Sequence, residues 1–361
     1  MSETGYGLVG CGRIAGPHIE AIAELNGARV VAVTDPDEAR AGAVADQVDG
    51  EVTVHADLSG LLADPAVDVV VVGAPTHLHP EIGVASMDSG RHVYSEKAMA
   101  AHLGGCREMI DAAERNGVRL TVGHSTRFRP AFTMARRMIE RGEIGEVVGV
   151  HGTFTAQANP PEMGATDSWR YRSESAGNGH VINFGCHYID TARFVCGQDP
   201  VTVSGFIRNR FSPEMVPEDQ FVITCECDGG ALITIALHPT LCPAPAGREG
   251  LTIHGSEGCI HALWRPDRVE ITTGRDGLTP VTIDEDLHGN PFVFLHTAFW
   301  DAIETGGPVP VTGEDAMRNV EWGLAAYLSS EGNCRVQLPL GPEYEDYAGP
   351  RLAETIPATR A

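Results

Sequence analysis

The stretch "YGLVGCGRIAGPH", residues 6–18, decides the first half of the fold. It starts with a short apolar run and continues with Gly10, Gly12 and Ala15 in the pattern G-x-G-x-x-A, before a segment with helical spacing. Glycines at these positions let backbone amides approach a pyrophosphate, and the N-terminus of the following helix stabilises its negative charge. The strand before and the helix after give the pattern its weight. We therefore expect a dinucleotide-binding loop here.

The first 123 residues alternate between two sequence periods. Short β-branched runs occupy residues 6–10, 28–34, 67–73, 91–95 and 119–123, and segments with helical spacing lie between them at 13–25, 36–47, 80–89 and 101–116. Strands that are rich in valine on both faces are typical of buried parallel strands. Alternating strands and helices predict a doubly wound parallel sheet of the Rossmann type.

The pattern changes after residue 124. It predicts a helix at about 130–141, a hairpin over 221–238 that turns at 228–230, further strands over 261–283 that turn at 276–277, and helices at 293–305 and 313–330. We predict an α/β protein with a dinucleotide-binding Rossmann domain at 1–123. An α+β domain for substrate binding and oligomerisation, with a large and mainly antiparallel open sheet, follows at 124–340. A C-terminal arm covers 341–361.

Composition limits the possible functions. The formal charge of −23 over 361 residues argues against binding to nucleic acid or to anionic membranes. The sequence shows no apolar run near the roughly 20 residues of a membrane span, and no signal-peptide pattern at its start. The nine cysteines are scattered without a C-x-x-C pair, which favours a reducing cytoplasm. Cys225 and Cys227 alternate along an expected strand, so we predict core positions for them and no metal site.

An acidic residue specifies the expected cofactor. Asp35 closes the second predicted strand, 23 positions after Gly12. Its carboxylate suits the 2′-hydroxyl of an adenosine ribose and repels a 2′-phosphate, and Pro36 supplies no cation, so we expect NAD rather than NADP. The predicted cofactor-binding residues are Gly10, Cys11, Gly12, Arg13, Ile14, Asp35, Ala74, Thr76, His79 and Glu96. His77 and His79 form an H-x-H pair, for which we expect a loop near the cofactor rather than a metal site.

Lys97 is the only lysine among the 26 basic residues. Arginine keeps its proton under ordinary conditions, whereas an ammonium group can release one, so a single retained lysine indicates a site that needs lysine chemistry. Drift in an arginine-rich composition is the alternative. Lys97 follows the predicted strand 91–95 closely, at the edge of the sheet where ligands bind. We expect it beside the nicotinamide.

Several stretches in order resemble the glucose–fructose oxidoreductase/inositol dehydrogenase (Gfo/Idh/MocA) family. They are "VGCGRIAGPH", "APTHLHPEI" with Pro75 and His79, "GRHVYSEKA", "VGHSTRFRPAF", "WRYRSESAGNGHVINFGCHYID", "IHGSEG" and "FWDAIETGGPVPVTGEDAMRNVEWGLAAY" with "VQLPL". The resemblance covers nearly the whole chain. It implies a sugar, cyclitol or related polyol that is oxidised by hydride transfer to NAD, and a homodimer or homotetramer.

The resemblance also implies roles for single residues. The family's lysine corresponds to Lys97 and its active-site histidine to His187. Two positions depart from the family pattern: Asn183 stands where many members have an aspartate, and Ala98 replaces the proline of an E-K-P motif. On this basis His187 is the expected general base, and Lys97 donates to the substrate oxygen and stabilises or relays its proton. Asn183 can orient His187 or a substrate hydroxyl.

Three further residues are candidates for substrate recognition. Sugars favour planar donors and aromatic faces, which Arg127, Trp169 and Arg170 supply. A structural role remains the alternative for each. Two other functions also remain open, namely a non-redox enzyme that uses NAD transiently to cleave glycosides, and a sugar-sensing regulator without catalysis. The apolar strand positions Ile223, Cys225, Ile233 and Ile235 would pair with another subunit if no helix covers them.

Overall fold

The computed structural model describes residues 3–157, 179–209, 218–240, 249–264, 266–273 and 277–349. The chain divides into two compact units. The first contains Met1–Ser125 and Asn290–Arg318, and the second contains Thr126–Gly289 and Asn319–Ala361. We expected one uninterrupted second domain over 124–340, whereas residues 290–318 return to the first unit. The reason is helix α10 (Pro291–Thr305), which packs on helix α1 (Ala15–Ala23).

The first unit is built on a parallel sheet. Its strands are β1 (Thr4–Val9), β2 (Ala28–Thr34), β3 (Thr53–His55), β4 (Val69–Val72), β5 (His92–Ser95) and β6 (Leu120–Val122). They lie in the order β3-β2-β1-β4-β5-β6, which is the order of a doubly wound dinucleotide-binding sheet, so the predicted Rossmann fold is confirmed. The order reverses direction between β1 and β4. A ligand crevice is therefore expected beyond the carboxyl ends of these strands.

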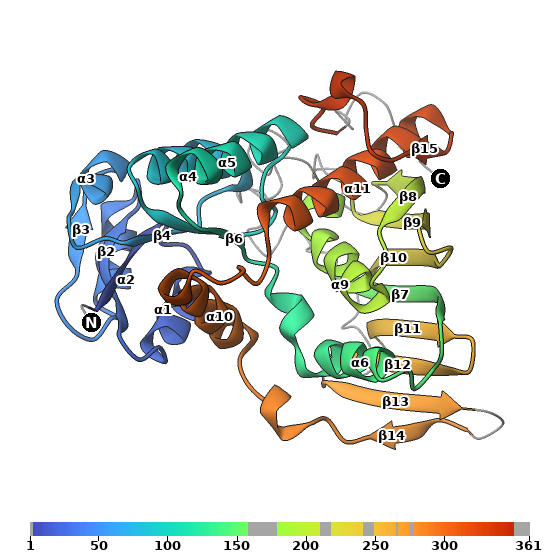
Figure 1. Cartoon of the computed structure of the whole chain (residues 1–361). Coiled ribbons are helices and arrows are strands. Elements are labelled where there is room, and N and C mark those ends of the chain that lie inside the picture. The colour runs from blue at the N-terminus through green and yellow to red at the C-terminus, as the bar shows by residue number, and fades with distance from the viewer. Residues whose placement is uncertain are drawn as a thin grey trace. The chain divides into compact units, whose positions relative to one another are not determined.

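Helices cover both faces of this sheet. They are α1, α2 (Glu38–Ala45), α3 (Leu58–Ala63), α4 (His79–Asp88), α5 (Leu103–Asn116) and α10. Figure 1 shows α4 and α5 on one face and α1 and α10 on the other. Local chemistry fixes the ends of several helices: the Asp37 side chain accepts from the backbone of Arg40 at the start of α2, and Gly117 ends α5 in the left-handed conformation.

Strand β3 and helix α3 had no counterpart in the sequence prediction. β3 has only three residues and lies at the edge of the sheet, where Thr53 and Val54 are exposed. Because an exposed edge strand needs no continuous apolar run, periodicity does not reveal it. The predicted strands and helices elsewhere in this unit match those of the structure.

The second unit contains a mixed sheet. Its described strands are β7 (Val147–Gln157), β8 (Pro200–Arg208), β9 (Gln220–Cys227), β10 (Leu232–Thr240), β11 (Glu249–Gly255), β12 (Gly258–Trp264), β13 (Arg268–Thr273), β14 (Thr279–Val281) and β15 (Val336–Gln337). They follow the order β14-β13-β12-β11-β7-β10-β9-β8-β15. Only β7 and β10 pair in parallel among them, so the prediction of a mainly antiparallel sheet is confirmed. The hairpin predicted over 221–238 is β9 and β10. The turn predicted at 276–277 lies partly outside the described residues.

Helices cover one face of this second sheet. Helix α6 (Pro130–Glu140) packs on β12 and β13, and helix α9 (Cys186–Cys196) packs on β7 and β10, as Figure 1 shows. The apolar face that we considered for subunit pairing, formed by Ile223, Cys225, Ile233 and Ile235, is buried within the chain. The condition for its pairing with another subunit is therefore not met. The opposite face exposes Phe206 and Leu232.

A long helix, α11 (Gly313–Gly332), begins in the first unit and ends in the second. Beyond it, Tyr347 donates to Glu331 on this helix, and residues 350–361 of the expected C-terminal arm lie outside the described part. Within the described residues, none of the helices has both the length and the apolar character that crossing a bilayer requires.

A buried carboxylate holds the start of the short helix α8 (His180–Asn183), which precedes α9. Glu218 accepts from the backbone of Val181 at 2.5 Å and from the Tyr327 hydroxyl at 2.6 Å. Its other oxygen, Oε2, has no hydrogen-bond partner among the described residues. Burial raises the pKa of Glu218 to about 7, although these two donors act to lower it.

The substitution Glu218→Gln tests this clamp. An acid whose pKa is higher in the folded chain binds more protons when folded, so its contribution to stability is lost as pH rises from 4.5 towards about 7. The amide retains the acceptor and removes the charge. The free energy of unfolding of the variant, relative to that of wild type, should therefore increase by on the order of 2 kcal/mol when the pH is raised from about 5 to about 8. Urea unfolding at both pH values measures this gain. Glu226→Gln, an exposed change on β9, is the control and should show no such pH dependence.

Candidate functional site

The two glycines of the loop after β1 have different surroundings. Gly10 has a φ of +96°, and a Cβ there would lie 2.7 Å from the carbonyl carbon of Gly73. Gly10 is therefore required for the loop to pack against the end of β4. A Cβ on Gly12 would meet nothing within 4 Å, and Gly12 is exposed. The open backbone at Gly12, followed by the N-terminus of α1 without an acidic first turn, fits the pyrophosphate of a dinucleotide.

Asp35 lies at the end of β2 and is buried. Its carboxylate accepts from the backbone of Cys11 at 2.8 Å and from that of Asp37 at 2.9 Å. It thereby ties the nucleotide loop to β2, in addition to its predicted role towards a ribose. The Arg40 guanidinium lies 3.4 Å away, a neighbour that the sequence analysis did not identify. Burial raises the pKa of the Cys11 thiol to about 12, so this thiol stays protonated.

The His79 ring contacts two loops of the candidate site. It is the first residue of α4 and is buried. Nε2 lies 2.8 Å from the carbonyl oxygen of Ala74, and Nδ1 lies 2.8 Å from that of Ala98. Burial lowers its pKa, although both carbonyls favour the protonated ring. Because both ring nitrogens contact the protein itself, His79 joins the loop after β4 to the Lys97 segment and has no nitrogen left for a metal or a cofactor.

Glu96 and Lys97 follow β5. Glu96 is 7% exposed and accepts from the backbone N–H of Lys97 at 3.2 Å. Its Oε1 lies 3.3 Å from Nε2 of His18. Burial acts to raise the pKa of Glu96, but the contact with His18 and the charge of Lys97 outweigh it and hold the pKa below its ordinary value. Glu96 is thus an ionised, buried carboxylate, and Lys97 is half-buried.

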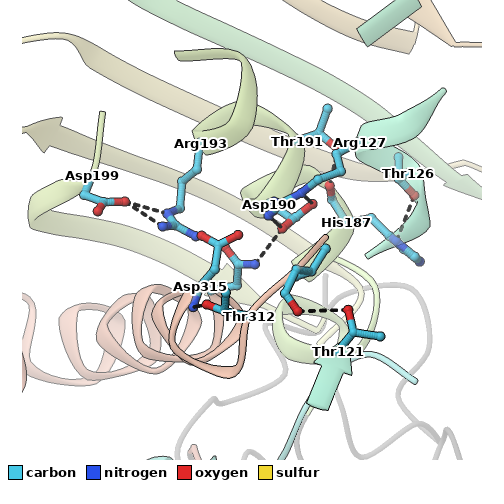
Figure 2. A network of polar contacts seen from close by, with 12 residues as sticks. Thr121, Thr126, Arg127, His187, Asp190, Thr191, Arg193, Asp199, Thr312 and Asp315 are labelled. Atoms are coloured by element: carbon cyan, nitrogen blue, oxygen red, sulfur yellow. Dashed lines mark hydrogen bonds and ion pairs between the residues drawn. The ribbon is translucent and has the colours of Figure 1, made fainter. Parts of the chain in front are cut away.

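In the second unit, His187 lies in the first turn of α9. Its Nδ1 is 2.9 Å from the hydroxyl oxygen of Thr126, as Figure 2 shows. Its backbone carbonyl accepts from Thr191 at 2.6 Å, one turn along the helix. Asn183 ends α8, four residues earlier, and its backbone carbonyl accepts from the Cys186 thiol. One partner of the His187 ring is therefore a hydroxyl from another segment.

Arg127 binds a carboxylate inside the protein. Its guanidinium makes a two-pronged ion pair with Asp190 of α9, with Nε at 2.9 Å from Oδ2, and it lies over the Phe194 ring. Asn319 donates to Asp190 at 2.7 Å and accepts from Arg193 at 2.7 Å. Figure 2 shows Arg127, Asp190 and Arg193 of this network beside His187. Arg127, which we predicted to bind substrate, thus anchors α9. Trp169 and Arg170 lie outside the described residues.

The structure groups the predicted residues within each unit. The nucleotide loop with Arg13 and Ile14, Asp35, Ala74, Thr76, His79, Glu96 and Lys97 belong to the first unit, and Arg127, Asn183 and His187 belong to the second. Over the described parts of the chain, no three His, Cys, Asp or Glu residues are arranged to hold a metal ion. The Cys225 and Cys227 thiols lie 3.8 Å apart in the buried face of β9.

The sequence analysis did not identify four residues that take part in these polar contacts, namely Thr126, His18, His296 and Arg40. Thr126 stands in the quoted stretch "VGHSTRFRPAF" and His18 ends "VGCGRIAGPH", so the signal for both was their place inside motifs. His296 lies 278 positions from its partner His18, a pairing that no local pattern reveals.

Two known family models match successive parts of the chain, one in each unit. Residues 4–124 match the model of an oxidoreductase family with an NAD-binding Rossmann fold. Residues 132–261 match the model of the GFO/IDH/MocA C-terminal domain. The two matches follow one another along the chain and together cover more than half of it.

Individual proteins resemble the chain over different lengths. Inositol 2-dehydrogenase 2 of Saccharopolyspora erythraea is 31% identical over 64% of this chain, and the match spans only 65% of that relative. The scyllo-inositol 2-dehydrogenase (NAD(+)) of Bacillus subtilis is 27% identical over 93% of this chain and 97% of its own length. A levoglucosan dehydrogenase, solved in complex with NADH and levoglucosan, has the same fold, with a TM-score of 0.83, 22% identity and coverage of 94% of this chain and 100% of that one.

The substitution Gly12→Ala tests the nucleotide loop. A methyl group at Gly12 enters space that the protein leaves open, so the variant should fold like wild type but bind NADH at least about tenfold more weakly. Gly10→Ala is the matched comparison, since its methyl group clashes with Gly73 and should lower thermal stability. Fluorescence titration with NADH and thermal melts measure the two effects. Unchanged NADH affinity in Gly12→Ala would exclude this loop as the pyrophosphate site.

Proposed function

Because the chain belongs to the Gfo/Idh/MocA family of oxidoreductases, we propose that it is an NAD-dependent dehydrogenase. Its substrate is a sugar, a sugar derivative or an inositol-like cyclitol, of which it oxidises a secondary hydroxyl. Relatives named as inositol dehydrogenases support this substrate class.

The first unit supplies the cofactor site. Gly12 and the N-terminus of α1 would hold the pyrophosphate, and Asp35 would accept from the adenosine ribose. Bound NAD supplies the hydride acceptor for the reaction. The segment of Ala74 and Thr76 after β4 and the segment of Glu96 after β5 border the other half of the crevice.

His187 acts as the general base in this proposal. A base needs an unprotonated nitrogen, and Thr126 can accept a hydrogen bond from Nδ1–H, which leaves the lone pair on Nε2. The ion pair of Arg127 with Asp190 holds the helix on which His187 lies. Asn183 orients His187 or a substrate hydroxyl through its amide.

Lys97 donates to the substrate oxygen as the alkoxide develops, and it can relay the proton. Trp169 and Arg170 remain proposed contacts to the substrate hydroxyls. The observation that carries the proposal is the position of Lys97. The only lysine of the chain directly follows the buried carboxylate at the end of β5, in a sheet with the dinucleotide-binding strand order.

A panel of sugars and cyclitols tests this function. Purified protein with NAD and each compound should form NADH in proportion to substrate consumed for at least one member of the panel. Release of a free sugar without net NADH would instead support glycoside cleavage, and binding without turnover would support a sensor. Lys97→Arg should lower turnover by about a hundredfold or more and leave NADH binding intact, because arginine does not release a proton. Native turnover in this variant would contradict the role of Lys97.

We also propose that the chain forms a homodimer or homotetramer through the open face of the second sheet. Phe206 and Leu232 are 65% and 61% exposed on that face, and burying such large apolar side chains against a second copy of the chain would be favourable. The described cysteines are all free thiols, which supports a reducing cytoplasm as the location.

The substitution Phe206→Glu tests the open face. A charge placed in a subunit interface is costly to bury, so the variant should dissociate to monomers and keep its fold. Size-exclusion chromatography with light scattering gives the mass of wild type and variant. Val54→Glu, at an exposed apolar position of the first unit, is the control and should leave the mass unchanged. An oligomer that persists in Phe206→Glu would show that another surface holds the subunits together.

A further inference from the structure

A chain of buried polar side chains lies behind Lys97. It consists of Glu96 after β5, His18 on α1 and His296 on α10. Their exposed fractions are 7%, 1% and 0%. The His18 ring lies between the other two, with Nε2 at 3.3 Å from Glu96 Oε1 and Nδ1 at 2.9 Å from Nε2 of His296. Three segments that are distant in sequence thus meet in one polar cluster within the core of the first unit.

Hydrogen-bonding requirements indicate which ring nitrogens of this chain carry protons. Nδ1 of His296 is buried without a hydrogen-bond partner among the described residues. An unpaired lone pair in a protein interior costs less than an unpaired N–H, so the proton of His296 lies on Nε2. His296 then donates to Nδ1 of His18, which leaves the proton of His18 on Nε2, 3.3 Å from Glu96 Oε1. This last contact is a close polar approach that lacks the geometry of a hydrogen bond. Burial lowers the pKa of His296 well below its ordinary value, in agreement with a neutral ring.

The surroundings hold the three side chains in place. The Tyr94 ring stacks on His296 at 4.4 Å and meets His18 edge-on at 5.1 Å. A Cβ at Gly123 would lie 2.8 Å from Oε1 of Glu96, so a larger residue there would displace the carboxylate. Lys97 and His79 also act on Glu96, and both favour its ionised form. Burial and the charge of Glu96 raise the pKa of Tyr94, so its phenol stays neutral.

The strand order gives this carboxylate a function towards the cofactor. Asp35 directly follows β2 on the adenosine side of the sheet, so the nicotinamide half of NAD belongs over β4, β5 and β6. Glu96 and Lys97 stand at the end of β5 in that half. Oxidised nicotinamide carries a positive charge, as does the Lys97 ammonium, and two neighbouring cations repel each other.

We infer that Glu96, kept ionised by the His18–His296 chain, offsets the charge of Lys97 and so allows the oxidised nicotinamide to bind beside it. This inference rests on the proposed function. It makes Glu96, His18 and His296 determinants of the preference for oxidised over reduced cofactor. The reduced ring is neutral, so its binding does not depend on this carboxylate.

The substitution Glu96→Gln separates the two cofactor states. It should raise the Kd for NAD about tenfold and change the Kd for NADH by less than about twofold. His296→Phe preserves the aromatic stack on Tyr94 but removes the donor to His18, and it should shift the ratio of the two Kd values in the same direction by a smaller factor. Calorimetric titration of each protein with NAD and with NADH gives these ratios, and thermal melts confirm folding.

Glu20→Gln is the matched control, since it removes the same charge from an exposed position on α1. Its ratio of Kd values should equal that of wild type. Equal weakening of both cofactors in Glu96→Gln would overturn the inference and leave the proposed dehydrogenase intact. If His296→Phe has the wild-type ratio of the Kd for NAD to the Kd for NADH, the role of the three-residue chain is overturned. This test holds even if Glu96→Gln fails to fold. Wild-type protein that binds neither cofactor would instead refute the proposed function itself.

Discussion

The close approach of Gly10 to Gly73 is the constraint on which the first unit depends. It brings the loop after β1 against the loop after β4, where the Ala74 carbonyl faces one nitrogen of His79. The other nitrogen of His79 faces the carbonyl of Ala98, next to Lys97. The backbone of Lys97 donates to Glu96, and Glu96 faces His18 on α1, the helix that the first loop starts. These contacts form a closed ring, so each loop of the cofactor crevice is positioned by its neighbours.

Much of this fold could be predicted because its signals are local. A strand of valines such as β4 is apolar on both faces, and the glycine loop stands directly between a strand and a helix. The return of α10 to the first unit had no such signal. Its segment has helical periodicity, but periodicity does not state which sheet a helix covers. That choice depends on Trp300 and His296, whose partners Thr4 and His18 lie near the other end of the sequence.

The candidate site residues also divide into those that local sequence identifies and those whose contacts depend on distant parts of the chain. Position in a motif identified Lys97, Glu96 and His187 as candidates, since a motif gives residue type and spacing. It could not show where a side chain points. Arg127 looked like a donor for sugar hydroxyls, but Asp190 lies 63 positions away in sequence and 2.9 Å away in space. A buried arginine without that carboxylate would be strongly destabilising, so the ion pair by itself accounts for an arginine at this position.

The chain passes between the units three times, and two of these connections enter the second unit at the helix of His187. The first lies between Ser125 and Thr126, and Thr126 contacts the His187 ring directly. The last lies within α11, between Arg318 and Asn319, and Asn319 binds Asp190 and Arg193 of the same helix. Helix α9 is therefore held at two points by residues next to a crossing. Because a buried ion pair and its hydrogen bonds resist separation, these contacts fix α9 relative to Thr126 and Asn319 within the second unit. The Thr126 hydroxyl thus holds the His187 ring, and the ion pair of Arg127 with Asp190 holds its helix. Position 183, where many family members have an aspartate, is asparagine in this chain.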